Sequence, residues 1–301
     1  MNKKLFAFKD IDNHLIFSFW GIKLSFKHKC NFKYKPAVEV GITSEKRSPQ
    51  VIVSLTTHPA RIKSAHLAIN TLLKQSFKPD RIILWLAEEQ FINKKKDLPK
   101  EIIELEKFGL EIRWTEDIKS YKKLIPALKE FPQEIIVTAD DDIYYEKDWL
   151  ETLYNKYLEF PNCIVCQRPR RLELVDDKIK VLSSRKSECL DLSKPDYFNQ
   201  MLGGAGCLYP PHSLYKDVFD IDKIFRLLPT NDDVYFWAMA VLKGTKIAVA
   251  KGFNGTIYQM DLKETSLCKI NNHIENIEKK DPFKIITSKY PEIIEKMQED
   301  I

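Results

Sequence analysis

From Gln50 onward, short apolar runs rich in branched residues alternate with segments in which apolar residues recur every three or four positions. The first pattern predicts buried β-strands, and the second predicts helices that bury one face. Strands that alternate with helices of about ten residues are typical of βαβ units, and so of an α/β fold with a mostly parallel sheet and helices on both faces. We predict strands at Val51–Leu55, Arg81–Ala87, Leu110–Trp114 and Glu134–Thr138, and helices near residues 62–73, 99–109, 121–131 and from 148.

The same pattern predicts where a ligand would bind. In parallel sheets, ligands bind beyond the carboxyl ends of the strands. The loops that follow the four predicted strands are therefore the expected edge of a site. These loops are residues 56–61, 87–89, 115–123 and 139–142.

The alternation weakens after about residue 167. Residues 168–196 are charged and irregular, and Gly203–Gly206 then uses three of the nine glycines. An apolar stripe predicts a helix over 232–243, and a short apolar run predicts a strand at 246–250. The stretch from Ile274 is polar and helical in pattern. One main domain over residues 49–301, preceded by an appendage over 1–48, is the economical interpretation.

The composition is typical of a folded globular protein. Of the 301 residues, 44% are hydrophobic and 30% are charged, which excludes disordered, collagen-like and coiled-coil classes. No apolar run approaches the ~18 residues of a membrane-spanning helix, and no cleavable signal is recognisable. We therefore expect a cytoplasmic protein.

The net charge of +5 is concentrated in the appendage. Residues 1–50 hold ten Lys and Arg against four Asp and Glu, interleaved with aromatic residues from Phe6 to Phe32. This pattern suits an anionic membrane surface, because lysines are attracted to it and aromatic rings sit at the interface. A small β structure with solvated lysines is the alternative. Binding of nucleic acid is disfavoured, since the remaining chain has no basic excess.

Asp140, Asp141 and Asp142 follow directly after a predicted strand. Consecutive carboxylates repel one another, and Mg²⁺ or Mn²⁺ removes that conflict because such cations prefer carboxylate, phosphate and water oxygens. In an extended segment the first and third side chains point to the same side, so Asp140 and Asp142 can face one site. A solvated turn is the alternative, but the position at a strand end favours a metal site.

A strand that runs into an Asp-x-Asp after a nucleotide-binding βαβ half resembles a GT-A fold glycosyltransferase, and the linear order resembles the bacterial family 2-like group that builds lipooligosaccharide or capsule. The resemblance covers about residues 50–260. The matching segments are VSLTTHPARI (53–62), PDRIILWLAEEQF (79–91), DIKSYKKLIPAL (117–128), IIVTADDDIYY (135–145), GGAGCLYPP (203–211) and NDDVYFWAMAVL (231–242).

The resemblance implies a role for several residues on the donor side. Thr56 would lie under the nucleotide, Arg61 near the ribose or phosphates, and Glu88 beside the base or ribose. Asp117 and Lys122 would belong to the loop that closes over the base and the diphosphate. The alternatives are that Arg61 and Lys122 are solvated and that Glu88 is a surface residue.

The resemblance also implies roles for the three residues of the acidic triplet. Asp140 would face the ribose or the metal, Asp142 would be the direct metal ligand, and Asp141 would lie with them at the nucleotide. His273 is a weaker candidate for a late metal ligand, since a single histidine in a polar segment is usually a surface residue.

On the acceptor side, Asn231, Asp232 and Asp233 precede a predicted helix, where one of them can serve as the cap. A cap needs one residue, and inverting GT-A enzymes place a general base here, so Asp233 is the preferred base and Asp232 the alternative. The helix dipole should keep the pKa of this base low. The loop of Gly203 and Gly204 would allow close approach to the acceptor sugar.

The resemblance therefore implies an inverting, metal-dependent hexosyl-type transfer from a nucleotide-sugar, with a UDP-sugar favoured, to a hydroxyl of a surface glycan or glycolipid precursor. Residues 49–145 would bind the donor, 146–270 the acceptor, and 271–301 would form a helical tail. One alternative is a nucleotidyl or phosphoryl transferase, although no glycine-rich phosphate loop lies between residues 50 and 60. The other is a non-catalytic carbohydrate-binding protein.

Overall fold

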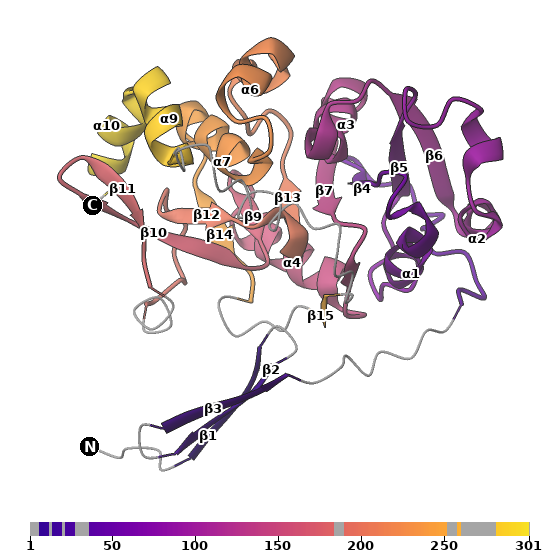
Figure 1. The fold of residues 1–301 in the computed structure, drawn as a ribbon, viewed down its shortest axis with the longest axis horizontal. Coiled ribbons are helices and arrows are strands. Elements are labelled where there is room, and N and C mark those ends of the chain that lie inside the picture. Colours follow the sequence, from indigo (N-terminus) through magenta and orange to yellow (C-terminus); the bar gives the residue numbers. More distant parts are fainter. Residues whose placement is uncertain are drawn as a thin grey trace.

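The centre of the protein is a seven-stranded sheet (Figure 1). The computed structural model describes residues 6–11, 14–19, 22–27, 36–183, 190–251, 258–259 and 281–300. All neighbouring strands of this sheet run parallel except β13, which is antiparallel to both of its neighbours. The predicted α/β fold with a mostly parallel sheet is thus confirmed. The strand order is β14 (Ile247–Val249), β9 (Ile164–Cys166), β13 (Cys207–Tyr209), β7 (Ile135–Ala139), β4 (Val51–Thr56), β5 (Arg81–Ala87) and β6 (Leu110–Thr115).

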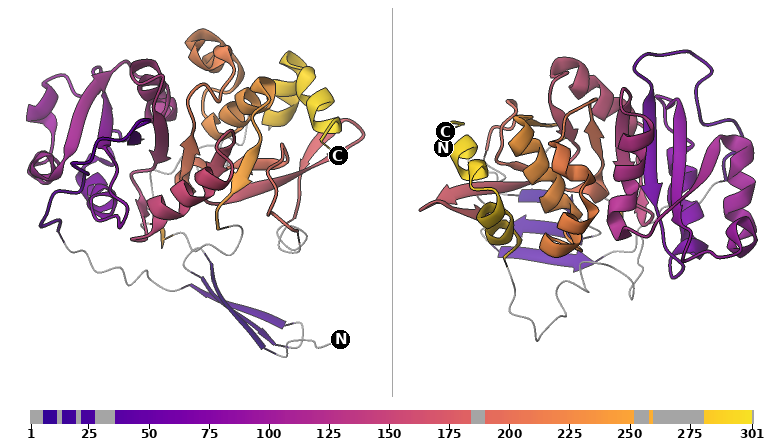
Figure 2. Two further views of the ribbon diagram at one scale, coloured as in Figure 1. Left: turned by 180° about the vertical axis from the view of Figure 1, so that it is seen from behind. Right: turned by 90° about the horizontal axis from the view of Figure 1, so that it is seen from above.

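The central strands are continuous apolar runs because both faces of the sheet are covered. Two apolar cores lie on the two faces, and helices flank the sheet on both sides (Figure 2). One core includes residues of α1 (Ile62–Leu72), α2 (Lys100–Glu104), η2 (Leu105–Phe108) and α4 (Trp149–Glu159). The other includes residues of η3 (Lys119–Lys123), α3 (Ile125–Glu130), η5 (Lys216–Phe219), α6 (Ile221–Leu227), α7 (Asp232–Lys243), α9 (Pro282–Lys289) and α10 (Glu292–Gln298).

Most predicted boundaries agree with the structure within two residues, and the helix at 121–131 is the informative exception. It consists of the 3₁₀ helix η3 followed by the α-helix α3, which carries Pro126 in its first turn. Proline has no N–H for a preceding turn and is favoured at a helix start, so the α-helix begins there. The break places Lys122 and Lys123 in the 3₁₀ segment at the edge of the sheet.

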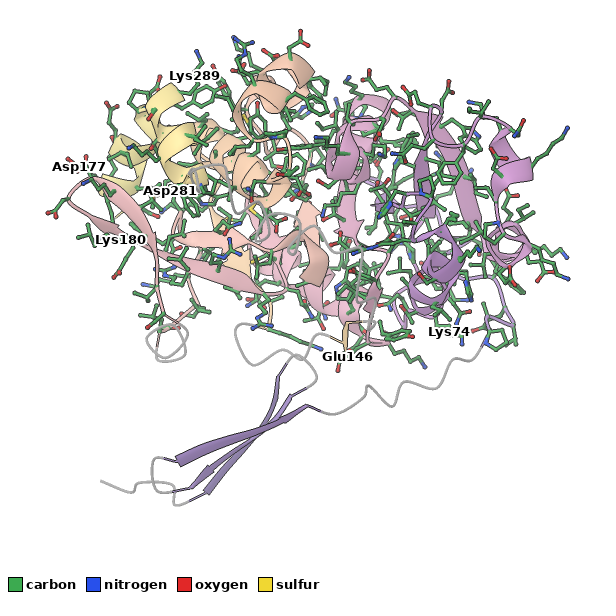
Figure 3. The ribbon with its side chains drawn as sticks, in the orientation of Figure 1. Lys74, Glu146, Asp177, Lys180, Asp281 and Lys289 are labelled. Carbon is green, nitrogen blue, oxygen red and sulfur yellow. The ribbon has the colours of Figure 1, made fainter. Side chains whose placement is uncertain are left out.

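The segment expected to be irregular contains a second small sheet. Its strands are β10 (Pro169–Val175), β11 (Lys178–Val181) and β12 (Asn199–Met201). Asp176 and Asp177 form the turn of the β10–β11 hairpin with φ angles of 50° and 56°, as in turns that match strand twist. Charged side chains such as Asp177 and Lys180 lie on the outside of this hairpin (Figure 3). The many charged residues of this half-exposed hairpin are the reason that its two strands were not predicted from the sequence.

The N-terminal residues form the predicted small β appendage. The strands β1 (Phe6–Ile11), β2 (His14–Phe19) and β3 (Ile22–Lys27) make a separate antiparallel sheet. Their side chains, and with them the predicted basic and aromatic surface, lie outside what the structure describes. Within the described residues, every helix is too short or too polar to cross a membrane. The remaining short elements are η1 (Lys94–Asp97), β8 (Ile143–Tyr144), η4 (Gly203–Ala205) and β15 (Tyr258–Gln259).

Candidate active site

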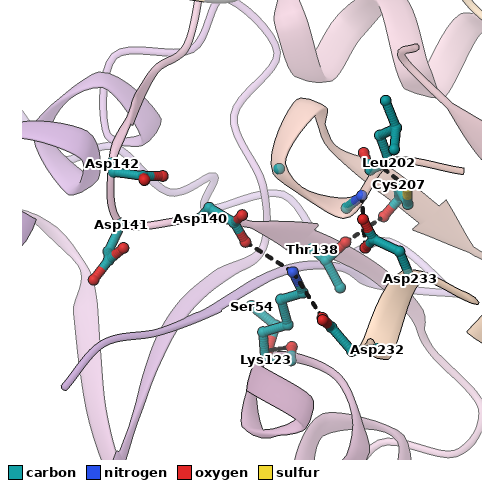
Figure 4. Close-up of polar contacts among 12 residues, drawn as sticks. Ser54, Lys123, Thr138, Asp140, Asp141, Asp142, Leu202, Cys207, Asp232 and Asp233 are labelled. Carbon is teal, nitrogen blue, oxygen red and sulfur yellow. Dashed lines mark hydrogen bonds and ion pairs between the residues drawn. The ribbon is translucent and has the colours of Figure 1, made fainter. Parts of the chain in front are cut away.

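Several of the predicted site residues meet where β7 ends, beside the η4 loop and the first turn of α7 (Figure 4). Strands β7 and β13 pair in antiparallel register, with Thr138 opposite Cys207. The chain that leaves β7 at Asp140 therefore runs beside the chain that enters β13 through Gly203–Gly206. The sheet register thus joins the expected donor half to the expected acceptor half at this point.

Lys123 lies at the centre of this cluster. Its Nζ is 2.9 Å from Asp140 Oδ1 and 3.1 Å from Asp232 Oδ2 (Figure 4). Burial acts to lower the pKa of Lys123, but Asp140 and Asp232 outweigh it and hold the pKa well above its ordinary value. A permanently charged ammonium therefore links the two acidic clusters. Lys123 was not among the site residues predicted from the sequence.

Arg61 lies on the other side of the acidic triplet. Its Nη1 is 2.7 Å from Asp141 Oδ1 and 3.0 Å from Asp142 Oδ2. Thr57 Oγ1 also donates a hydrogen bond to Asp141 Oδ2, at 2.5 Å. Burial acts to lower the pKa of Arg61, but Asp141 and Asp142 outweigh it and raise the pKa. The alternative that Arg61 is solvated is therefore wrong.

The outer carboxylates of the triplet fit a divalent cation. Asp140 and Asp142 extend to the same side of the strand end, and Asp141 turns to the other side (Figure 4). Burial and the charge of Asp140 raise the pKa of Asp142 to about 6, so these two effects outweigh the ion pair between Asp142 and Arg61. Mg²⁺ is usually bound by one or two carboxylates together with substrate phosphates and water. Asp140 and Asp142 match that protein contribution.

The described residues do not form a complete metal cage. Among them, no group of three or more His, Cys, Asp or Glu side chains is placed to hold a metal ion. A cation at Asp140 and Asp142 would thus need further ligands from a substrate. His273, the weaker candidate ligand, lies outside the described residues.

Asp233 lies in the first turn of α7, and its side chain faces the η4 loop. Its Oδ1 accepts a hydrogen bond from Gly203 N at 3.0 Å. Burial and the charge of Asp232 raise the pKa of Asp233 to about 7. The expectation that the helix dipole keeps this pKa low is therefore wrong. A dipole contributes typically 0.3–1 kcal/mol, about a pKa unit at most, which is less than the opposing effects of burial and a like charge.

Asp232 and Asn231 complete the second acidic cluster. Asn231 occupies the cap position of α7, but its side chain makes no capping hydrogen bond. Asp232 is buried, and its Oδ2 accepts no hydrogen bond from the described residues although Lys123 Nζ lies near it. The charge of Lys123 is therefore the main interaction that compensates the burial of the Asp232 carboxylate.

Gly203 and Gly204 leave no room for a side chain. A Cβ at Gly203 would lie 2.7 Å from Asp233 Oδ1, and a Cβ at Gly204 would lie 2.9 Å from Asp140 Oδ2. The glycines therefore allow the loop to lie directly against both acidic clusters. Their predicted contact with an acceptor sugar stays a prediction.

Two aromatic residues hold this loop in place. The Tyr145 hydroxyl accepts a hydrogen bond from Asp140 N at 2.7 Å and donates one to Gly204 O at 3.0 Å. Trp149 Nε1 donates a hydrogen bond to Ala205 O at 2.9 Å. Both aromatic side chains are buried. Tyr145 thus connects the end of β7 to the loop through one hydroxyl group.

Asp117 and Lys122 form an ion pair in the loop after β6. Gln90 Nε2 also donates a hydrogen bond to Asp117 Oδ2 at 2.7 Å. Burial acts to raise the pKa of Asp117, but the hydrogen bond and charge of Lys122, together with the hydrogen bonds from Lys119 N and Gln90, outweigh burial, and the pKa is lowered. The Lys122 side chain is only 3% exposed, so the alternative that it is solvated is wrong.

His58 lies near enough to this ion pair and to the acidic triplet to be affected by the charges of both. Burial lowers the pKa of His58, and the charges of Asp141, Arg61, Lys122 and Asp117 all act on it. Its imidazole is therefore neutral near pH 7. No role for His58 was predicted from the sequence.

Thr56 and Glu88 are the more peripheral candidates. Thr56 Oγ1 donates a hydrogen bond to Trp85 O at 2.8 Å, which ties the end of β4 to β5. The Glu88 side chain is 57% exposed and pairs with Lys94 at 2.5 Å. Contacts of Thr56 and Glu88 with a nucleotide stay predictions.

A hollow of about 270 Å³ lies elsewhere, between the end of β6 and α3. Its floor includes Trp85, Ile118 and Ile125, and its rim includes Glu116 and Lys129. None of the acidic residues at the end of β7 or the start of α7 lines it. We therefore assign the chemistry to the charged cluster, where titratable groups with shifted pKa values converge.

No protein-family model and no curated protein matches the chain. Among solved structures, residues 1–349 of S. aureus TarS are similar, with a TM-score of 0.45 and 16% identity over 83% of this chain and 70% of that chain. The same TarS fragment in complex with UDP-GlcNAc is similar at the same TM-score and identity, over 79% of this chain and 71% of that chain.

Proposed function

We propose that the protein is a glycosyltransferase that moves a sugar from a nucleotide-sugar to an acceptor hydroxyl. The observation that supports this proposal is the approach of two acidic clusters from different parts of the chain. The triplet at Asp140–Asp142 could bind the diphosphate of a donor through a divalent cation, and Asp233 could accept the proton of an acceptor hydroxyl. The loop that begins at Gly203 lies between them.

On the donor side, we assign Asp140 and Asp142 to a bound Mn²⁺ or Mg²⁺. The cation, when bound, supplies positive charge that neutralises the leaving diphosphate. Arg61 keeps its own charge and orients Asp141 and Asp142 through ion pairs. Lys122, held by Asp117, adds a second cation on the nucleotide side. A UDP-sugar is the donor that the sequence resemblance favours.

On the acceptor side, Asp233 is the proposed general base. Proton transfer is most efficient when the pKa of the base lies near the working pH, and burial with Asp232 places the pKa of Asp233 at about 7. The hydrogen bond from Gly203 N fixes Oδ1, so Oδ2 is the oxygen assigned to the acceptor proton. Because Asp233 acts on the acceptor and forms no bond to the sugar, the transfer is inverting in this proposal.

The acceptor proposal rests on the sequence resemblance and on the appendage. We propose a glycan or glycolipid precursor of the lipooligosaccharide or capsule type. A basic, aromatic segment over residues 1–35 would hold the enzyme on an anionic inner-membrane surface, where such a precursor is made. In this proposal the enzyme works in the cytoplasm.

The test is a product assay with a panel of nucleotide-sugars, in Mn²⁺ and in EDTA, with the wild type and with Asp233→Asn. Release of a nucleoside diphosphate with transfer of the sugar, dependent on Asp233, is expected. Release of a sugar phosphate or a nucleoside monophosphate would indicate a nucleotidyl or phosphoryl transferase instead. Sugar binding without release of any nucleotide would indicate a carbohydrate-binding protein. Either of the latter results would refute the proposal.

A further inference from the structure

Lys123 is the buried cation that touches both acidic clusters. Its side chain is 6% exposed, and its Nζ lies 2.9 Å from Asp140 and 3.1 Å from Asp232. Asp140 belongs to the end of β7, and Asp232 belongs to the start of α7, about ninety residues later in the sequence. One ammonium group therefore joins the two parts of the proposed active site (Figure 4).

The backbone of Lys123 is fixed independently of its carboxylate partners. Ser54 Oγ donates a hydrogen bond to Lys123 O at 2.6 Å, and Trp85 Nε1 donates one to Ser54 Oγ at 3.0 Å. These bonds tie Lys123 to β4 and β5 beneath it. The sheet thus fixes the backbone from which the Lys123 ammonium reaches both carboxylates.

The tight packing around Lys123 supports a positioning role. A Cβ at Gly203 would lie 2.9 Å from Lys123 Nζ, so the η4 loop lies directly over the ammonium. A buried ion pair alone is a weak reason for such a residue, because apolar packing often gives equal stability. The location, against the loop that holds Asp233, points instead to a role in the reaction.

We propose that Lys123 is a positioning residue for sugar transfer. Its ammonium binds both Asp232 and the donor carboxylate Asp140, and so keeps the neighbouring Asp233 at a fixed distance from Asp140. This inference rests on the proposed function. Without the ammonium, the partly exposed Asp140 and the buried Asp232 are two like charges at the same place and repel each other. The first turn of α7 then no longer presents Asp233 at a fixed distance from the donor.

The test compares Lys123→Ala with wild type in sugar transfer at saturating donor. We expect kcat to fall about 100-fold, the lower end of what a positioned general base contributes. The donor KM should not rise, because the proposed donor ligands remain. Lys100→Ala, the same change at an exposed residue of α2, is the matched control and should transfer sugar at the wild-type rate.

Chemical rescue separates the charge from the space that it fills. Propylamine, as its ammonium, should restore the kcat of Lys123→Ala by at least about tenfold, whereas 1-propanol of similar size should not. If Lys123→Ala does not fold, the isosteric Lys123→Met takes its place, and its kcat should fall to the same extent.

Two results would overturn the inference while the proposed function stands. These are a variant kcat close to that of wild type, and equal rescue by propylamine and 1-propanol. A wild-type chain that transfers no sugar from any donor would instead overturn the proposed function, and the inference with it.

Discussion

Replacing Asp233 by asparagine should stabilise the protein above neutral pH while removing most of its proposed activity. Burial and the charge of Asp232 raise the pKa of Asp233 from 3.8 to about 7. The ionised form is therefore disfavoured in the folded protein, and the unfolded chain holds fewer protons between those two pH values. As pH rises from about 4 to 7, this group lowers the stability of the wild type progressively.

The size of the effect follows from the same two values. Asparagine has nearly the same shape, carries no charge, and still offers an oxygen to Gly203 N. The stability gain of Asp233→Asn over wild type should grow by roughly 2–3 kcal/mol between pH 5 and pH 8. Transfer should fall by roughly 10²–10⁴-fold, because a positioned acid–base group typically contributes that factor.

The assay is urea unfolding of both proteins at pH 5 and pH 8, with the transfer rate at saturating donor measured in parallel. Asp222→Asn is the matched control, since Asp222 is an exposed acid in the first turn of α6. It should show little difference between the two pH values. A gain for Asp233→Asn that is equal at both pH values, or a loss of stability at pH 8, would refute the reasoning. Full activity would move the base to Asp232.

Three further outcomes are expected. Binding of a nucleoside diphosphate should weaken in EDTA and recover with Mn²⁺, and Asp142→Ala should abolish the recovery; equal affinity in EDTA would contradict the metal site. Gly206→Ala should lower the free energy of unfolding by about 2 kcal/mol or more, because a Cβ there meets the Trp149 ring at 2.5 Å and φ is +105°. Gly244→Ala, with φ of +85° but no contact nearer than 3.9 Å, should cost less, and equal losses in the two variants would argue against the clash. Removal of residues 1–35 should abolish binding to anionic vesicles at low salt; unchanged binding would give the segment another role.

The sheet was predictable because the composition of its central strands is typical of buried β-strands. β4, β5 and β7 are short, largely apolar runs, and each ends at a change to polar residues. The carboxyl-end rule then placed Asp140 and Arg61 at one edge, where the structure has them interacting with their neighbours. Periodicity and strand direction are local properties, so one sequence suffices to find them.

Lys123 and the pKa of Asp233 were not predictable in the same way. Lys122 and Lys123 are adjacent in the sequence, and both lie in the 3₁₀ helix η3. In that geometry Lys122 pairs with Asp117, whereas Lys123 pairs with Asp140. The pKa of Asp233 depends on burial and on Asp232, which only the packed structure establishes. Contacts with residues distant in sequence decide the position of Lys123, and burial by the packed chain decides most of the pKa of Asp233.

The antiparallel strand β13 restricts how substrates can reach the site. It lies within the expected acceptor segment of the sequence, yet it pairs directly with β7 of the donor half. The two halves therefore share one continuous sheet, and a hinge that opened between them would break the β7–β13 ladder. Donor and acceptor must instead arrive over the edge of the sheet, past side chains and loops, while the strands beneath them stay joined.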